Sequence, residues 1–377
     1  MYKKSAFISI LLILLAASAL FAGCTGSETP AAGTADTSGT VEMITITDSL
    51  GREVTVPKSP DAVVCSGPGT LRYLTYIQAE DKIVGVDDIE TDETQFDARP
   101  YAFANPQFKD YPLIGEFRGN DDPEKIIACN PDVIFKSYVT SASDADELQE
   151  KTGKPVVALN YGNLGVYRDD MYQSLRIMGE VMSKEDRAED VIAFFDSSIA
   201  DLNTRTESIA DEDKKSAYIG GIAHKGPHGF QSTEPSYAPF LFVNALDVAG
   251  DLGTEHADVA KEKIIEWNPD VLFVDLSTLQ TTPSAVDELK TDEAYQTLDA
   301  VKSGEVYGVL PYNWYTSNHG SVLADAYYIG SVLYPDQFAD VDPAAKADEI
   351  YTFLVDGPVF DQMNAAFSNV AFTQLEL

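Results

Sequence analysis

Positive charge is scarce in this sequence. The 377 residues include only 26 lysines and arginines against 61 aspartates and glutamates, which gives a formal net charge of −35 at neutral pH. A surface of this kind repels nucleic acids and anionic lipid headgroups, so a nucleic-acid-binding role is excluded. The acidity favours solubility and carries little information about the fold.

Cysteine is rare as well. The chain has three: Cys24, directly after an N-terminal apolar stretch, and Cys65 and Cys129 further along. Cys65 and Cys129 stand in the apolar contexts "AVVCSG" and "IIACNPD". Such surroundings predict two buried free thiols, although the sequence alone leaves a disulfide between them open.

Histidine is missing from the first half of the chain, because all four histidines follow residue 223. A site for a bare metal ion between two halves of the protein would lack imidazole ligands from one side. His224 and His228 have the spacing of a zinc pair, but Gly226 and Pro227 between them prevent the helix that usually presents this spacing. We therefore expect no directly bound metal ion.

The motifs of the common catalytic sites are also missing. The sequence contains no G-x-S-x-G, no P-loop, no H-E-x-x-H and no G-x-G-x-x-G. A nucleophile elbow, a nucleotide-phosphate loop, a helical zinc pair and a dinucleotide-binding turn are therefore not indicated. We expect a protein that is not an enzyme and has no cofactor.

The N-terminus carries the strongest local signal. Two lysines in "MYKK" precede an apolar run at residues 6–22, and "GC" follows. This order of charged, apolar and small residues predicts a secretory signal at residues 1–23. "LFAGC" resembles the lipobox of exported lipoproteins, with Phe21 where Leu or Val is usual, and implies cleavage before Cys24 and acylation of its thiol. The alternative is an uncleaved membrane anchor, for which the run is at the short limit.

After Cys24 the composition changes. Residues 24–43 are rich in Ser, Thr, Gly, Ala and Pro and have almost no large apolar side chains. This composition predicts a flexible tether rather than a folded segment.

The folded body begins near Ile44. "MITITDSLGREVTVP" alternates apolar and polar residues around a "DSLGR" turn, which predicts a β-hairpin. A short apolar strand in "DAVVCSGPG", a helix in "TLRYLTYIQ" and a strand in "KIVGVDD" follow. Strands that alternate with helices predict a parallel α/β architecture.

One stretch of the chain occurs twice, as "EKIIACNPDVIF" from Glu124 to Phe135 and as "EKIIEWNPDVLF" from Glu262 to Phe273. Each copy predicts a short helix that an Asn-Pro pair ends, followed by a buried strand. In the first copy Asp122 is the expected N-cap. A helix containing "DEL" and a further strand follow each copy, so the repeat covers helix, strand, helix and strand.

The repeat predicts two similar α/β lobes. We expect an N-terminal lobe at residues 44–166, linking helices at 167–209 and a C-terminal lobe at 210–377. The linking segment has helical apolar spacing, which predicts one helix to about Met182 and a long one from about Lys184 to Ser208. The predicted fold class is α/β, with two duplicated Rossmann-like lobes joined by a single long helix and a ligand cleft between them.

The lipobox, the tether, the duplicated lobes and the helical connection together resemble a class III substrate-binding protein of ABC importers. The opening hairpin and the repeated Glu-x-Ile…Pro-Asp pattern are similar to elements of that family, over about residues 44–340. The resemblance implies a monomer, lipid-anchored at the outer face of the cytoplasmic membrane. It would capture a metal complex, such as a ferric siderophore, and deliver it to a permease dimer with its ATPase.

The same resemblance gives the first residue of each repeat a role. In this family an acidic residue on each lobe docks onto a basic pocket of each permease subunit, and the matching positions are Glu124 and Glu262. Two exposed carboxylates, one on each lobe, suit a two-fold symmetric partner. The alternative is that both are favourable helix N-terminal charges only.

The ligand is expected where the strands of the two lobes end, around one cleft. Candidate ligand-binding residues at these tips are Ser66, Thr70, Arg118, Tyr138 and Tyr161 in the first lobe, and His224, Lys225, His228, Tyr237, Tyr312, Trp314 and Tyr315 in the second. Aromatic walls with a few cations suit a bulky, partly apolar, anionic ligand such as a metal chelate. Arg118 could instead form a structural ion pair with Asp121.

Other ligands remain open. Molybdate or tungstate would be held by cations and backbone N–H groups more than by aromatic rings. Cobalamin and haem are further alternatives within the same fold. A hydrolase that uses His224, and an adhesion lipoprotein, are remote alternatives.

Overall fold

The computed structural model describes residues 41–91, 95–118 and 120–377. The predicted signal at residues 1–23 and the lipidation site at Cys24 lie outside the described residues, as does most of the predicted tether. Within the described residues no helix is both long enough and apolar enough to cross a membrane.

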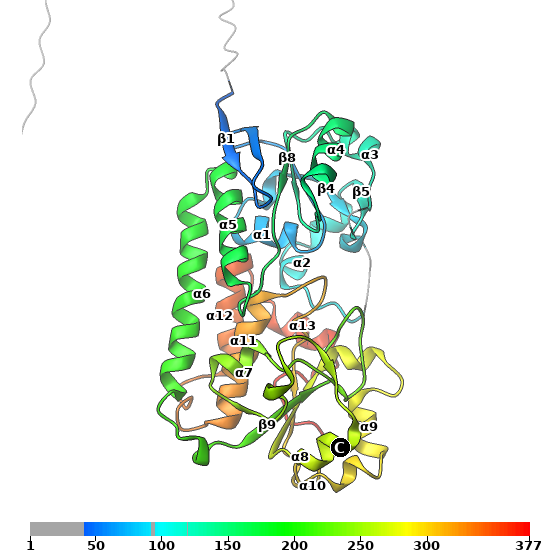
Figure 1. Cartoon of the computed structure of the whole chain (residues 1–377), viewed down its shortest axis with the longest axis vertical. Coiled ribbons are helices and arrows are strands. Elements are labelled where there is room, and N and C mark those ends of the chain that lie inside the picture. Colours follow the sequence, from blue (N-terminus) through cyan, green and yellow to red (C-terminus); the bar gives the residue numbers. More distant parts are fainter. Residues whose placement is uncertain (1–40, 92–94, 119) are drawn as a thin grey trace, which may run out of the picture. The chain divides into compact units, whose positions relative to one another are not determined.

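The N-terminal lobe is built on a six-stranded sheet (Figure 1). Its strands are β3 (Val63–Ser66), β4 (Ile83–Asp87), β5 (Leu113–Glu116), β6 (Asn120–Asp121), β7 (Val133–Lys136) and β8 (Val156–Ala158). They lie in the order β6-β5-β4-β3-β7-β8, and every pair is parallel except β5–β6. The hairpin of β1 (Met43–Thr47) and β2 (Glu53–Pro57) precedes the sheet, as the alternating pattern predicts.

The C-terminal lobe is built on a four-stranded parallel sheet, β11-β9-β13-β14. Its strands are β9 (Ser216–Gly220), β11 (Leu246–Asp247), β13 (Val271–Asp275) and β14 (Val306–Val309), and β10 (Ser232–Thr233) pairs separately with β12 (Ala257–Asp258). The strands β3, β7 and β8 of the first lobe correspond in order to β9, β13 and β14 of the second. The predicted α/β class with two similar lobes is therefore confirmed.

The helices cover and connect the sheets. They are α1 (Thr70–Tyr76), α2 (Pro100–Ala104), α3 (Pro123–Cys129), α4 (Ala142–Thr152), α5 (Arg168–Met182), α6 (Glu185–Thr206), α7 (Ala238–Phe242), α8 (Lys261–Trp267), α9 (Ala285–Thr291), α10 (Asp299–Ser303), α11 (His319–Leu333), α12 (Pro343–Val355) and α13 (Phe360–Ala366). Short 3-10 segments lie at Glu80–Lys82, Asp88–Glu90, Pro106–Asp110, Asp211–Asp213, Gly250–Leu252, Leu276–Gln280 and Tyr295–Thr297.

The repeated stretch folds as α3–β7 in one lobe and α8–β13 in the other. Asp122 caps α3, because its carboxylate accepts hydrogen bonds from the N–H groups of Glu124 and Lys125. Asn130 and Asn268 end the two helices in the left-handed region, at φ 49° and φ 42°. Asparagine tolerates this conformation, and the proline after each asparagine cannot continue a helix. The doubled sequence therefore produces the same helix–turn–strand unit in both lobes.

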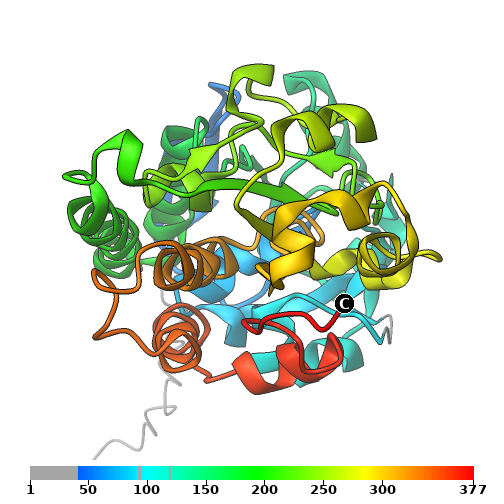
Figure 2. The ribbon, with the colours of Figure 1, turned by 90° about the horizontal axis from the view of Figure 1, so that it is seen from below.

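Helix α6 connects the two lobes, as predicted for residues 184–208 (Figure 1). The last helices add a connection that the sequence did not predict, since α12 packs on α11 and also on α1 and α2 of the first lobe. The orange and red helices lie next to one another in Figure 2. One buried apolar cluster includes strand residues of both lobes, such as Val133 and Val271. This shared core favours a small movement of the lobes over a wide hinge.

The two cysteines of the body are free thiols, with Cys65 buried and Cys129 partly buried. This agrees with the prediction from their apolar surroundings. Burial, and then the nearby Asp87 and Glu90 carboxylates, raise the pKa of Cys65 well above its ordinary value. The Cys65 thiol is therefore protonated and unreactive at neutral pH.

Candidate functional site

The carboxyl ends of the strands of both lobes surround a cavity of about 320 Å³. It is lined by Pro68, Ile89, Phe117, Arg118 and Tyr138 from the first lobe and by Ala223, Lys225, Gly226, Pro227, Asn313, Trp314, Tyr315 and Thr316 from the second. Each of these residues follows a strand, because β3, β4, β5 and β7 end just before the first group and β9 and β14 before the second. The cavity therefore lies where parallel α/β lobes usually bind ligands.

The turn after β3 brings the backbone close to this cavity. Gly67 and Gly69 have φ of 84° and 80°, where a side chain would be strained. A Cβ on Gly67 would also lie 2.6 Å from the carbonyl oxygen of Ser137, and one on Gly69 would lie 1.9 Å from the ring of Tyr161. The "CSGPG" turn therefore needs both glycines for conformation and for space.

The charged side chains that line the cavity are both cations. Arg118 and Lys225 are exposed, and the cavity lining in the described part of the chain includes no Asp or Glu. The proposed ion pair between Arg118 and Asp121 is not formed, because Asp121 instead pairs with Lys136 at 2.5 Å. The Arg118 guanidinium lies 5.1 Å from the centre of the Phe117 ring. In a chain of net charge −35, two cations that form no ion pair with a carboxylate of the described residues offer a local site for an anion.

Aromatic rings form the walls of the cavity. Phe117 and Tyr315 meet edge to face across the two lobes, with ring centres 5.4 Å apart and planes at 70°. Trp314 lies next to Tyr315 in the loop after β14 and is partly buried, and Tyr138 is 66% exposed at the rim. These rings offer apolar contact area to a ligand that the two cations orient.

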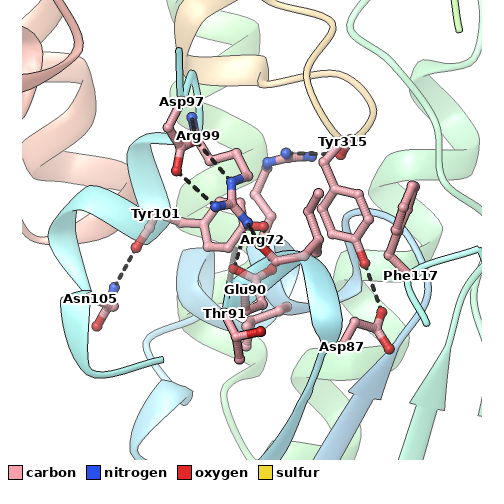
Figure 3. A network of polar contacts seen from close by, with 12 residues as sticks. Arg72, Asp87, Glu90, Thr91, Asp97, Arg99, Tyr101, Asn105, Phe117 and Tyr315 are labelled. Atoms are coloured by element: carbon pink, nitrogen blue, oxygen red, sulfur yellow. Dashed lines mark hydrogen bonds and ion pairs between the residues drawn. The ribbon is translucent and has the colours of Figure 1, made fainter. Parts of the chain in front are cut away.

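Tyr315 is held by a carboxylate of the other lobe. Its hydroxyl donates a hydrogen bond of 2.7 Å to Asp87 Oδ2, at the end of β4 (Figure 3). The same oxygen accepts a 2.8 Å hydrogen bond from the N–H of Gly67. Burial raises the pKa of Asp87 to about 7, against the lowering effect of these two hydrogen bonds. The Asp87 carboxyl therefore titrates near neutral pH while it positions a wall of the cavity.

Arg72 of α1 binds the backbone of the loop that contains Tyr315. Its guanidinium is buried and donates hydrogen bonds to the backbone carbonyls of Trp314, Tyr315 and Ser317, at 3.2, 3.1 and 3.0 Å. It also donates to the hydroxyl of Tyr161, which in turn donates to the Ser317 carbonyl at 2.6 Å. These contacts join the helix of one lobe to the loop of the other, so they fix the 314–317 segment against the N-terminal lobe.

A further ion-pair network lies beside Arg72 (Figure 3). Arg99 pairs with Glu90 at 2.9 Å and with Asp97 at 2.8 Å, and Tyr101 donates to Glu90 at 2.6 Å. The Arg72 guanidinium lies 5.1 Å from the centre of the Tyr101 ring. Burial raises the pKa of Glu90, although the charge of Arg99 acts to lower it. None of the residues of this network lines the cavity described above.

The structure brings five of the candidate ligand-binding residues together at this cavity, namely Arg118, Tyr138, Lys225, Trp314 and Tyr315. His224 and Tyr312 line a second, smaller cavity, and His228 lies at a separate surface hollow.

The remaining candidates have protein partners. The Ser66 hydroxyl bonds to Asp121, and the Thr70 hydroxyl donates to the Ser66 carbonyl at 2.9 Å. Tyr161 contacts Arg72, and the buried Tyr237 hydroxyl lies 3.5 Å from Asp325. None of these four lines the larger cavity.

The histidines do not form a preformed metal site. His228 Nε2 is 2.7 Å from the His224 carbonyl oxygen, and the rings of His224 and His256 stack. Within residues 41–91, 95–118 and 120–377, no group of three His, Cys, Asp or Glu side chains could hold a metal ion. His224 and His228 lie in a segment that is not helical, which is the effect predicted for Gly226 and Pro227 between them.

Sequence reasoning missed three residues that shape the cavity: Asp87, Arg72 and Phe117. Asp87 ends the "KIVGVDD" strand, so its place at a strand tip could have marked it. Phe117 precedes the candidate Arg118. Arg72 lies in a helix that is buried along its whole length, and nothing local distinguishes a buried arginine there from an exposed one.

The two repeat glutamates lie on the surface of the lobes. Glu124 and Glu262 are exposed in the first turns of α3 and α8. Their neighbours Asp122 and Glu266 pair with Lys125 and Lys263, whereas no ion pair of Glu124 or Glu262 is found with any described residue. Their carboxylates are available to a partner.

Comparison with known proteins gives matches over most of the chain. The profile of the family described as periplasmic binding protein matches residues 63–312. The chain is 22% identical over 329 residues to YvrC, an uncharacterized ABC transporter substrate-binding lipoprotein of Bacillus subtilis (87% of this chain, 97% of the relative). It is 27% identical over 325 residues to the petrobactin-binding protein YclQ of the same organism (83% and 93%). The crystal structure of the molybdate-binding protein MolA of Haemophilus influenzae has the same fold, with a TM-score of 0.64 and 20% identity (83% and 98%).

Proposed function

Since the chain belongs to the periplasmic binding protein family, we propose that it is the solute-binding component of an ABC importer. We further propose that the solute is an anionic metal complex. The permease dimer and its ATPase would then be its partners. Members of this family bind a solute and are not enzymes, so the hydrolase alternative is dropped. The relative named for an ABC transporter supports the importer, and the relative named as an Fe(3+)-citrate-binding protein supports an anionic iron complex.

The observation that carries the choice of ligand is the composition of the larger cavity. Its lining combines Arg118 and Lys225 with the rings of Phe117, Trp314 and Tyr315. Cations attract an anionic complex, and aromatic faces provide contact with the organic shell of a chelate. A bare divalent cation would be repelled by the two positive charges.

The volume of the cavity narrows the choice further. About 320 Å³ lies at the lower end of the range in which small-molecule sites usually fall. This favours a compact ferric chelate over a macrocycle such as haem or cobalamin. Molybdate or tungstate is the second candidate, because the chain resembles MolA over most of its length. A small oxyanion would, however, leave the aromatic walls without contact.

A thermal-shift screen tests the ligand class, since a ligand that binds only the folded state raises the melting temperature. The screen uses ferric catecholates and hydroxamates, ferric citrate, haem, cobalamin, molybdate, tungstate and divalent metal ions. We expect the largest shift with a compact ferric chelate. A shift with the oxyanions alone would favour the second candidate, and a shift with divalent ions alone would contradict both.

Docking to the permease is proposed for Glu124 and Glu262. Each is exposed, each starts a copy of the repeat, and neither is paired with a described residue. Two carboxylates in equivalent positions on two lobes match two equivalent basic sites on a symmetric permease. Their place in the first turn of a helix is favourable as well, so the structural role and the docking role are compatible.

Anchoring through Cys24 is also part of the proposal. The charged, apolar and small residues before Cys24 support it, and a relative is named as a lipoprotein. Mass spectrometry of protein extracted from membranes should show the loss of residues 1–23 and an added diacylglyceryl group. An intact Met1 would instead support an uncleaved anchor.

A further inference from the structure

A second cavity, of about 190 Å³, lies beside the larger one. The same two loops of the C-terminal lobe contribute to both cavities. In the loop after β9, His224 lines the smaller cavity and Lys225 lines the larger one. In the loop after β14, residues 313–316 line the larger cavity, and Tyr312 and Ser317 on either side of them line the smaller one. The N-terminal lobe contributes the loop of residues 163–167. The two cavities are thus neighbours whose linings share no residue.

The charges of the second cavity are opposite to those of the first. Its titratable lining consists of Glu234, Glu255, His224 and His256 with two tyrosines, and the lining in the described chain includes no Lys or Arg. One cavity is therefore suited to an anion and its neighbour to a cation.

Two polar groups in this second cavity have no protein partner. The carboxylate of the partly buried Glu234 forms no hydrogen bond or ion pair with any described residue. Tyr312 is 9% exposed, and its hydroxyl has no hydrogen-bond partner in the described part of the chain either. Both groups face the same cavity, so a carboxylate and a hydroxyl with no protein partner are available there to a ligand that supplies donors.

The surroundings of Glu234 disfavour its charge in the protein alone. Burial, followed by the carboxylates of Asp275 and Glu255, raises the pKa of Glu234 to about 7. The hydroxyl of the buried Tyr237 is also near, and the imidazoles of His224 and His256 stack at 4.3 Å in the same cavity. A cation bound here would favour the ionised carboxylate, which couples its binding to the release of a proton.

We propose that this second cavity binds a small organic cation, a protonated primary amine with a short apolar body. The ammonium group would donate to Glu234 and lie near the rings of Tyr167 and Tyr312, which attract cations. Leu164, Leu241 and Val322 provide apolar contact for the body of the molecule. A metal ion is a poorer occupant, because the described residues hold no group of three ligating side chains in metal-binding geometry.

Benzylammonium is a suitable probe, with benzyl alcohol as its uncharged match, in titration calorimetry of the folded body. We expect benzylammonium to bind and benzyl alcohol to bind at least ~10-fold more weakly, since a charge-assisted hydrogen bond is worth about 1.5–3 kcal/mol. Lowering the pH from about 8 to about 6 should weaken benzylammonium binding roughly 10-fold, because a proton then occupies the carboxylate of Glu234.

The substitution Glu234→Gln should remove most of the affinity for benzylammonium and most of the pH dependence. Tyr312→Phe, which deletes only the unpartnered hydroxyl, should weaken binding by a few-fold (~2–10-fold) and provides a second test if the glutamine variant does not fold. Glu266→Gln, at an exposed carboxylate of α8, is the matched control and should bind as the unchanged protein does.

Substitution of Arg118 and Lys225 separates this site from the larger cavity. These variants should bind benzylammonium as the unchanged protein does. This expectation does not depend on whether the larger cavity binds the anionic complex proposed for it. Equal binding of benzylammonium and benzyl alcohol, unchanged binding to Glu234→Gln, or stronger binding of Zn²⁺ or Ni²⁺ at this site would each overturn the proposal.

Discussion

The hydroxyl of Tyr315 donates a 2.7 Å hydrogen bond to Asp87, from a loop of the C-terminal lobe to a strand end of the N-terminal lobe. Tyr315 also forms a wall of the larger cavity. A side chain that faces the ligand is therefore positioned by the opposite lobe. The shape of the cavity depends on contacts between the lobes as well as on the residues that line it.

The hydrogen bond between Tyr315 and Asp87 should contribute to ligand affinity. Tyr315→Phe keeps the ring and removes the hydroxyl, so we expect binding of the anionic complex to weaken by about 2–10-fold, the value of one neutral hydrogen bond. Adding Asp87→Ala to Tyr315→Phe should cost less than the sum of the two single losses, because the contact between the two residues is lost only once, although Asp87→Ala also removes the hydrogen bond from the Gly67 N–H. Calorimetry of the two single variants and the double variant measures this coupling. Full additivity of the two losses would mean that the contact does not position the wall.

The two cations of the larger cavity should carry the charge recognition. Replacing both Arg118 and Lys225 by alanine is expected to reduce affinity for an anionic chelate by at least ~10-fold and to weaken the dependence of binding on salt. Lys302→Ala provides the control, because Lys302 is exposed and pairs with Asp299 in α10. An undiminished affinity in the double variant would contradict the anionic ligand.

Charge reversal of the repeat glutamates should separate binding from transport. Glu124→Lys together with Glu262→Lys should abolish uptake, because two basic permease sites would then face like charges, and should leave ligand affinity unchanged. The pair Glu147→Lys and Glu266→Lys reverses two other exposed carboxylates, one in each lobe, and should transport normally. Normal uptake with Glu124→Lys and Glu262→Lys would contradict the docking role. A loss of ligand affinity in these variants would show that the two glutamates act on the fold instead.

Stability should increase on mild acidification. Burial raises the pKa of both Asp87 and Asp275 to about 7, so the folded protein binds protons that the unfolded chain releases above about pH 4. The free energy of unfolding therefore falls as the pH rises toward 7. Lowering the pH from about 8 to about 6.5 should raise the free energy of unfolding by on the order of 1 kcal/mol for each of these two carboxyls.

Denaturant titration across this range measures the effect. Burial, and then the charge of Arg72, lower the pKa of His319 to about 3, which acts in the opposite direction only below about pH 6.5. Asp87→Asn and Asp275→Asn should each flatten the pH dependence. A free energy of unfolding that rises from pH 6.5 to 8 would contradict the direction expected for these carboxyls.

The sequence predicted the parts of the fold that local patterns encode. Helices α3 and α8 each end at an Asn-Pro pair. The alternating pattern of the β1–β2 hairpin and the helical spacing of α6 are also clear in the sequence. The return of α12 to the first lobe could not be predicted in this way. It depends on the packing of α12 against α1 and α2, which lie far from it in the chain.

The same limit applies to the larger cavity. Arg118, Lys225 and Trp314 could be predicted because residues at the ends of parallel strands meet at one edge. Ser66 and Thr70 also follow a strand end, but their hydroxyls bond to neighbouring protein groups. Whether a polar side chain at a strand end is satisfied internally depends on neighbours from other strands, and one sequence does not reveal these neighbours.

Tryptophan fluorescence gives the most direct test of the central claim, that the larger cavity takes an anionic metal complex. The chain has two tryptophans, Trp314 in the cavity lining and Trp267 in α8 of the C-terminal lobe. Titration with a compact ferric chelate should quench the fluorescence with saturation. Trp267→Phe should keep most of this quenching, and Trp314→Phe should lose it. Saturable quenching by the chelate that persists in Trp314→Phe, or no saturable response to any anionic metal complex, would contradict the account.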